Sequence, residues 1–170
     1  PVKPSPNLPD DWSITLYPST CFFEGTVLSE GRGTEHPFGI FGHPSLPNNL
    51  FTFTPVSTAG SKEPKLKNQV CYGYNLYQNK EALVPAFSQQ VNLQYLLTCY
   101  QQFPQKDSFF LPAKSGKDKD YFFNKLAGNA QLKQQIQQGV SEADIRKSWQ
   151  PALNAFKKIR KKYLLYPDFE

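Results

Sequence analysis

The chain has 170 residues and a mass of 19.4 kDa, and 39% of its residues are hydrophobic. This length fits a single domain, and the apolar content is too high for a disordered chain. The net charge of +5 is unevenly distributed: residues 1–100 hold six basic and seven acidic side chains, and residues 101–170 hold thirteen and seven. No apolar run approaches the ~18 residues of a membrane helix, so we expect no membrane span.

The chain opens with four prolines among its first nine residues, PVKPSPNLP. Prolines at this density keep a chain extended and are typical of linkers between domains. We therefore interpret residues 1–11 as an interdomain linker and residues 12–170 as a C-terminal domain that follows a domain absent from this sequence.

The first half of the chain has the patterns of short strands. Residues 13–17 (SITLY) are β-branched and aromatic, which predicts a strand, and residues 37–42 (PFGIFG) predict another. Apolar and polar side chains alternate in residues 50–55 and 69–77, which predicts an antiparallel pair. The connector between this pair, residues 57–68, is polar and carries three lysines, and we expect it to border a site.

The second half is predicted to be helical. Residues 91–103 place leucines and a tyrosine on one face before a proline, and residues 119–126 and 130–137 are shorter candidates separated by Gly128. Strands followed by helices predict an α+β domain, in which helices of the second half pack on a small antiparallel sheet of the first half.

The last helical region begins at the capping-box sequence SEAD, residues 141–144. Pro151 is expected in the first turn of a second helix, and Trp149 and Phe156 are expected in the core. The basic residues of segment 157–162 are interpreted as a solvated helix face, since no nucleic-acid motif accompanies them.

Residues 17–34 (YPSTCFFEGTVLSEGRGT) concentrate polar chemistry more than any other stretch. Arg32 lies between two glycines, which allow close approach of a ligand, and its guanidinium can bind a carboxylate or phosphate bidentately. The alternative, which composition alone favours, is a tight turn in which Arg32 pairs with Glu24 or Glu30. Two histidines seven residues apart and three scattered cysteines do not predict a metal site.

Several motifs carry a resemblance to a known family: PSPNLP, YPSTCFFEGT, SEGRGT, VCYGY, KLAG and the terminal SWQPALNAFKKIRKKYLLYPDF. The chain resembles the C-terminal domain of the NamZ-type exo-β-N-acetylmuramidases, formerly a domain of unknown function. The resemblance implies a two-domain, periplasmic or extracellular glycoside hydrolase that needs no cofactor. Such an enzyme releases N-acetylmuramic acid from the non-reducing end of peptidoglycan fragments, in a cleft completed by a Rossmann-like N-terminal domain, so the present segment alone is expected to be inactive.

Together with this expected substrate, the chemistry of residues 17–34 predicts roles for several of them. Arg32 is expected to bind the lactyl carboxylate of muramic acid, and Glu30 is the candidate for a second catalytic carboxylate. Alternatively, Glu24 and Glu30 both orient Arg32. The substrate-binding set is completed by Glu24, Ser29, Thr34 and Tyr17.

Two other classes of function stay open. A non-catalytic peptidoglycan-binding module would bind sugars as an isolated chain. A basic scaffold would bind nucleic acid or anionic envelope polymers through residues 157–162 in a salt-dependent way. Neither explains the acidic and hydroxyl groups around Arg32, and we expect no nucleic-acid partner.

Overall fold

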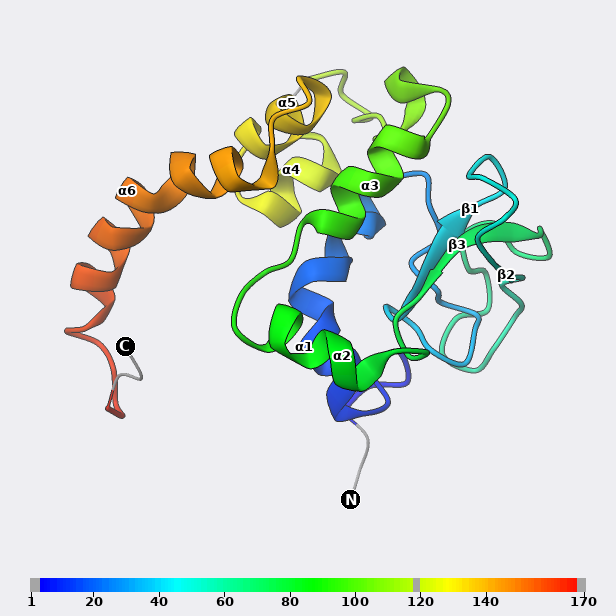
Figure 1. The fold of residues 1–170 in the computed structure, drawn as a ribbon, viewed down its shortest axis with the longest axis horizontal. Coiled ribbons are helices and arrows are strands. Elements are labelled where there is room, and N and C mark those ends of the chain that lie inside the picture. The colour runs from blue at the N-terminus through cyan, green and yellow to red at the C-terminus, as the bar shows by residue number, and fades with distance from the viewer. Residues whose placement is uncertain (1–3, 118–119, 168–170) are drawn as a thin grey trace.

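A computed structural model describes residues 4–117 and 120–167, in which six α-helices lie to one side of a three-stranded sheet (Figure 1). The strands are β1 (Ile40–His43), β2 (Phe51–Phe53) and β3 (Cys71–Asn75). The helices are α1 (Asp11–Thr20), α2 (Lys80–Ser88), α3 (Gln94–Gln102), α4 (Phe122–Ala127), α5 (Gln131–Gln137) and α6 (Glu142–Arg160), with 3-10 turns η1 (Cys21–Gly25) and η2 (Lys106–Ser108). The architecture is the α+β class that the sequence predicts.

The sheet has the order β1-β3-β2, and both pairs are antiparallel. The predicted pairing of segment 50–55 with segment 69–77 is confirmed as β2 and β3, with Phe53 opposite Cys71. The strand predicted in residues 37–42 begins only at Ile40, because Phe38 has a φ of 63° and residues 37–39 form a turn.

The strand predicted at residues 13–17 is wrong, since this segment lies within α1. The Asp10 side chain accepts a hydrogen bond from the backbone of Ser13, and the Ser13 hydroxyl reaches back to the backbone N–H of Asp10. This capping box starts a helix whose buried Trp12 and Leu16 are four residues apart. Local capping and burial therefore override the β-branched composition.

The helices predicted around residues 91–103, 119–126 and 130–137 are confirmed as α3, α4 and α5, although Lys119 lies outside the described residues. Gly128 ends α4 in the left-handed conformation. Helix α2 is not predicted by the sequence, because it is short, contains Pro85 and has no side-chain N-cap.

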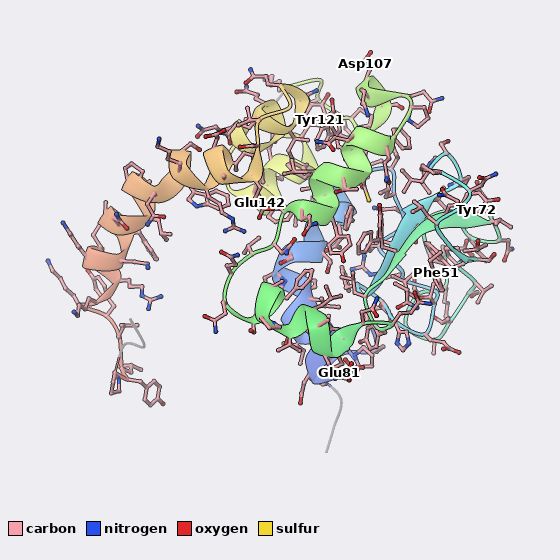
Figure 2. The ribbon with its side chains drawn as sticks, viewed as in Figure 1. Phe51, Tyr72, Glu81, Asp107, Tyr121 and Glu142 are labelled. Atoms are coloured by element: carbon pink, nitrogen blue, oxygen red, sulfur yellow. The ribbon has the colours of Figure 1, made fainter. Side chains whose placement is uncertain are left out.

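Helix α6 starts at the predicted cap, where Ser141 accepts a hydrogen bond from the backbone of Asp144. The expectation of a second helix at Pro151 is wrong, because α6 runs through this proline without a break. Trp149 packs against the core, but the core prediction for Phe156 is also wrong, since its side chain is 57% exposed. The later turns of α6 project away from the body of the fold, and most of their side chains are exposed (Figure 2).

The main core joins α1, η1, β1 and the helices of the second half. At its centre Phe23 of η1 stacks on Phe41 of β1, with ring centroids 4.3 Å apart. Phe22 of η1 also packs against Phe123 of α4. Because η1 is held from both sides, the polar segment that follows it begins at a fixed point. None of the described helices is long and apolar enough to cross a bilayer.

Candidate functional site

The polar segment between η1 and β1 is fixed by backbone hydrogen bonds. Ser29 exchanges two hydrogen bonds with Gly42 of β1, with N–O distances of 2.9 and 3.1 Å. The backbone N–H of Phe38 donates to the carbonyl oxygen of Glu30 at 2.7 Å. The backbone that carries Glu30 is therefore held against the sheet.

The two glycines beside Arg32 are required by the turn. Gly31 and Gly33 have φ angles of 81° and 82°, in the left-handed region. A Cβ atom on Gly31 would lie 2.2 Å from the carbonyl oxygen of Ile40, and one on Gly33 would lie 2.4 Å from that of Val56. The turn thus depends on glycine for both conformation and space.

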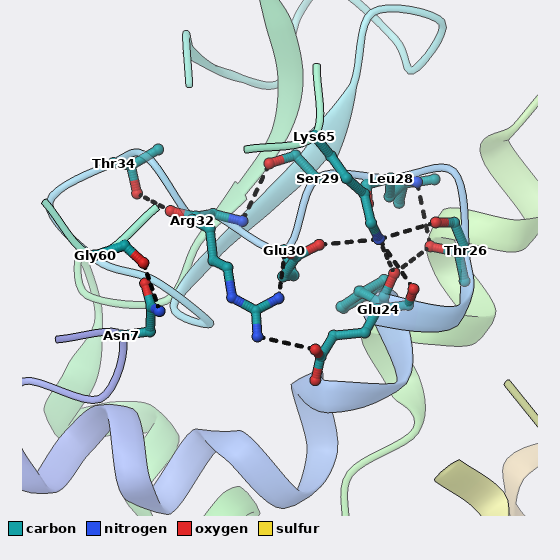
Figure 3. A network of polar contacts seen from close by, with 12 residues as sticks. Asn7, Glu24, Thr26, Leu28, Ser29, Glu30, Arg32, Thr34, Gly60 and Lys65 are labelled. Atoms are coloured by element: carbon teal, nitrogen blue, oxygen red, sulfur yellow. Dashed lines mark hydrogen bonds and ion pairs between the residues drawn. The ribbon is translucent and has the colours of Figure 1, made fainter. Parts of the chain in front are cut away.

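Arg32 bridges the two carboxylates of the segment (Figure 3). Its Nη1 donates to Oε1 of Glu30 at 2.7 Å, and its Nη2 donates to Oε2 of Glu24 at 2.9 Å. The guanidinium also lies over the ring of Phe38, with Cζ 4.8 Å from the centroid. Its side chain is 29% exposed, so part of it is open to solvent while both Nη atoms are held by carboxylates.

Lys65 completes this group and comes from the lysine-containing connector. Its Nζ lies 3.0 Å from Oε2 of Glu30, so both oxygens of that carboxylate are in ion pairs. The site thus contains two carboxylates and two cations. Lys65 itself was not predicted as a site residue. The available signal was only the lysine content of residues 57–68, and Lys67 of the same connector pairs instead with Glu63.

Glu30 is 2% exposed, and burial alone would raise its pKa. The ion pairs with Lys65 and Arg32 outweigh burial, so the pKa of Glu30 is lowered from its ordinary value of 4.5. The carboxylate is therefore ionised at neutral pH. Burial lowers the pKa of Lys65, while Glu30 opposes this shift.

The lowered pKa of Glu30 predicts how stability depends on pH. A carboxylate whose pKa is lower in the folded state stabilises the fold above its unfolded-state pKa, and this stabilisation is lost as the pH falls through the folded-state value. We expect Glu30→Gln to lower the free energy of unfolding at pH 7 by about 1–3 kcal/mol, and to flatten its decline below about pH 4.5.

Urea unfolding of both proteins between pH 7 and pH 3 measures this effect. Glu63→Gln is the matched control, because the Glu63 side chain is 81% exposed and its ion pair with Lys67 is expected to contribute little. Parallel stability curves for the wild type and Glu30→Gln would contradict the prediction.

The remaining predicted site residues lie around this group in different ways. Tyr17 is 36% exposed and packs edge-on against Phe38, with ring centroids 4.8 Å apart, and the Arg32 guanidinium lies over the same Phe38 ring. The Ser29 hydroxyl accepts a hydrogen bond from the backbone of Gly31, and the Thr34 hydroxyl donates to the Gly31 carbonyl oxygen at 2.7 Å. Both hydroxyls therefore shape the turn.

A hollow of about 580 Å³ lies beside residues 33–36 of the turn. Its apolar side is formed by Ile40, Phe51 and Phe53, and Thr34 and His36 are on its polar side. The described residues contain no group of three or more His, Cys, Asp or Glu side chains placed to hold a metal ion.

The fold and this group define a class of protein: a small α+β domain in which a glycine-flanked, partly exposed arginine is held between two carboxylates. Comparison with known protein families identifies the family to which this domain belongs. Residues 15–166 match the family model described as "Exo-beta-N-acetylmuramidase NamZ, C-terminal", and the chain belongs to this family.

Two relatives extend the comparison. The chain is 35% identical, over 176 aligned residues, to the peptidoglycan β-N-acetylmuramidase NamZ of Bacillus subtilis, covering 97% of this chain and 40% of that protein. It is also similar to a crystal structure of a DUF1343 family protein from Bacteroides fragilis, with 40% identity and a TM-score of 0.85, covering 99% of this chain and 44% of that one. The chain thus spans less than half the length of either relative.

Proposed function

We propose that this chain is the cleft-forming C-terminal domain of a glycoside hydrolase that releases N-acetylmuramic acid from the non-reducing end of peptidoglycan fragments. The observation that carries the proposal is that two carboxylates hold the guanidinium of Arg32 while its side chain stays partly exposed. The family, and the relative named as a peptidoglycan β-N-acetylmuramidase, support the substrate class.

Arg32 is suited to the group that distinguishes muramic acid from glucosamine, the lactyl carboxylate. A guanidinium has five N–H donors, and two of them are engaged by Glu24 and Glu30 among the described residues. The free donors on its exposed edge can bind a carboxylate with charge-assisted hydrogen bonds. Because Glu24, Glu30 and Phe38 fix the other side, little side-chain entropy is lost when the ligand binds.

The geometry favours a positioning role for the two glutamates over the catalytic role considered for Glu30. A glycosidase carboxylate must reach the anomeric carbon or the glycosidic oxygen, whereas Glu30 is buried and has both oxygens in ion pairs. In this proposal Glu24 and Glu30 orient Arg32, Ser29 and Thr34 hold the turn, and Tyr17 offers an aromatic edge to the sugar. The catalytic assignment of Glu30 stays a prediction that turnover by Glu30→Gln can test.

The proposal includes a partner domain of the same polypeptide. We infer that a Rossmann-like domain upstream of residue 1, linked through residues 1–11, forms the other wall of the cleft and carries the acid/base group. The shorter length of this chain relative to its two relatives supports this arrangement. Its substrate implies action in the periplasm or outside the cell.

The test is release of free N-acetylmuramic acid from its disaccharide with N-acetylglucosamine. The 170-residue chain and a chain extended upstream of residue 1 are assayed in parallel. We expect activity in the extended chain alone. Activity in neither, combined with saccharide binding by the 170-residue chain, would replace the proposal with a non-catalytic glycan-binding module.

A further inference from the structure

The ammonium group of Lys65 occupies a cage built from the segment that carries both glutamates (Figure 3). Four backbone carbonyl oxygens lie within 2.9 to 3.1 Å of its Nζ and share the three N–H donors of the ammonium group. Those oxygens belong to Phe23, Glu24, Thr26 and Leu28. A fifth oxygen, Oε2 of Glu30, lies 3.0 Å away.

This cage differs from a surface ion pair because backbone carbonyl oxygens contribute most of its contacts. Four carbonyl dipoles from one short stretch point toward the same place, and without a cation there they would repel one another. The ammonium gathers these carbonyls around a single centre, which sets the path of residues 23–28. Of the two glutamates that contact Arg32, Glu24 belongs to this stretch and Glu30 lies two residues after it.

Lys65 also sets the net charge of the group around Arg32. Glu24, Glu30 and Arg32 alone would carry a net charge of minus one, and an approaching carboxylate would be repelled. With Lys65 the four groups are neutral, and one carboxylate is paired on both oxygens. The guanidinium can then offer its exposed edge to an anion without a surplus of negative charge behind it.

We propose that Lys65 is the positioning residue for anion recognition by Arg32. It neutralises Glu30 and holds the carbonyl-lined segment so that Arg32 presents a fixed, attractive edge to the substrate carboxylate. This inference rests on the proposed function and adds a specificity role for a residue of the connector between β2 and β3.

The first experiment compares Lys65→Met with Lys67→Met in the full-length protein. Methionine is similar in length to lysine and lacks the charge, and Lys67 is two residues away in an exposed pair with Glu63. For the muramic acid disaccharide we expect Lys65→Met to raise KM about 10- to 100-fold with a smaller change in kcat, and Lys67→Met to stay within about twofold. An unchanged KM in Lys65→Met would overturn the inference.

The second experiment does not depend on activity. Lys65→Ala should leave an oxygen-lined space that a free ammonium ion can fill, because its size and donors match the lost group. We expect ammonium chloride to restore part of the lost thermal stability of Lys65→Ala, and tetramethylammonium chloride at equal ionic strength to have no such effect. An equal change in the thermal stability of Lys65→Ala with the two salts would contradict the proposed ammonium cage.

The outcomes separate this inference from the proposed function. A full-length wild type that releases no N-acetylmuramic acid would reject the proposed function, and the salt comparison on Lys65→Ala would still test the cage. An active wild type together with a Lys65→Met variant of normal KM would reject the role of Lys65 alone.

Discussion

Arg32→Ala is expected to abolish the preference for muramic over glucosamine substrates in the full-length protein. Under the proposed function the variant loses the charge-assisted hydrogen bonds to the lactyl carboxylate, and it leaves Glu24, Glu30 and Lys65 with a net charge of minus one. Two such bonds contribute about 3–4 kcal/mol, so kcat/KM for the muramic acid disaccharide should fall by about 100- to 1,000-fold. The matching glucosamine substrate has no carboxylate, so its turnover should change little.

Two variants control this measurement. Arg32→Lys keeps the charge but not the planar fork of donors, so we expect it to recover only part of the discrimination. Arg146→Ala removes an arginine that pairs with Glu142 on α6, away from the turn, and should leave the ratio between the two substrates unchanged. Discrimination that persists in a folded Arg32→Ala protein would refute the role of Arg32.

Gly31→Ala is expected to be the most destabilising conservative substitution in the turn. The residue has a φ of 81°, which costs a non-glycine residue about 1–2 kcal/mol. The added Cβ would also lie 2.2 Å from the carbonyl oxygen of Ile40, a backbone atom of the sheet that cannot move aside cheaply. We expect a loss of more than about 3 kcal/mol, or a decrease of roughly 10 °C in the melting temperature.

Gly128→Ala separates the two contributions to this loss. Gly128 has a similar φ of 76° at the end of α4, but no atom lies within 4 Å of a Cβ placed there. It should therefore lose only the conformational part, about 1–2 kcal/mol. Thermal unfolding of both variants followed by circular dichroism measures the difference. Equal losses would mean that the turn relaxes around the new methyl group.

The expected effects of Arg32→Ala and Gly31→Ala both depend on the rigidity of the turn. The glycines let the backbone fold back against β1 and against Val56, and the charged side chains are then held from behind by Lys65. An arginine that is already oriented binds a carboxylate with less entropic cost than one on a flexible loop. Rigidity of residues 29–34 is thus expected to matter for recognition as much as the charge itself.

Local sequence patterns determined much of the fold and indicated that Arg32 lies near Glu24 and Glu30. Period-two alternation predicted β2 and β3 and their pairing, and the apolar face of residues 91–103 predicted α3. The glycine-flanked Arg32 and its two glutamates were recognisable because all three lie within nine residues of one another. These features depend on residues that are close together in the chain, so they can be predicted from local sequence patterns.

Other features of the fold and of the group around Arg32 were set only by the tertiary structure. Residues 13–17 form a helix because capping and burial outweigh their β-branched composition. Phe156 is exposed because α6 leaves the body, which its helical periodicity cannot reveal. Lys65 joins the site across 35 residues of sequence, paired with Glu30 and caged by carbonyls, while the nearby Lys67 pairs with Glu63. Which lysine is buried depends on the path of the whole connector over the sheet, a long-range property that no local pattern encodes.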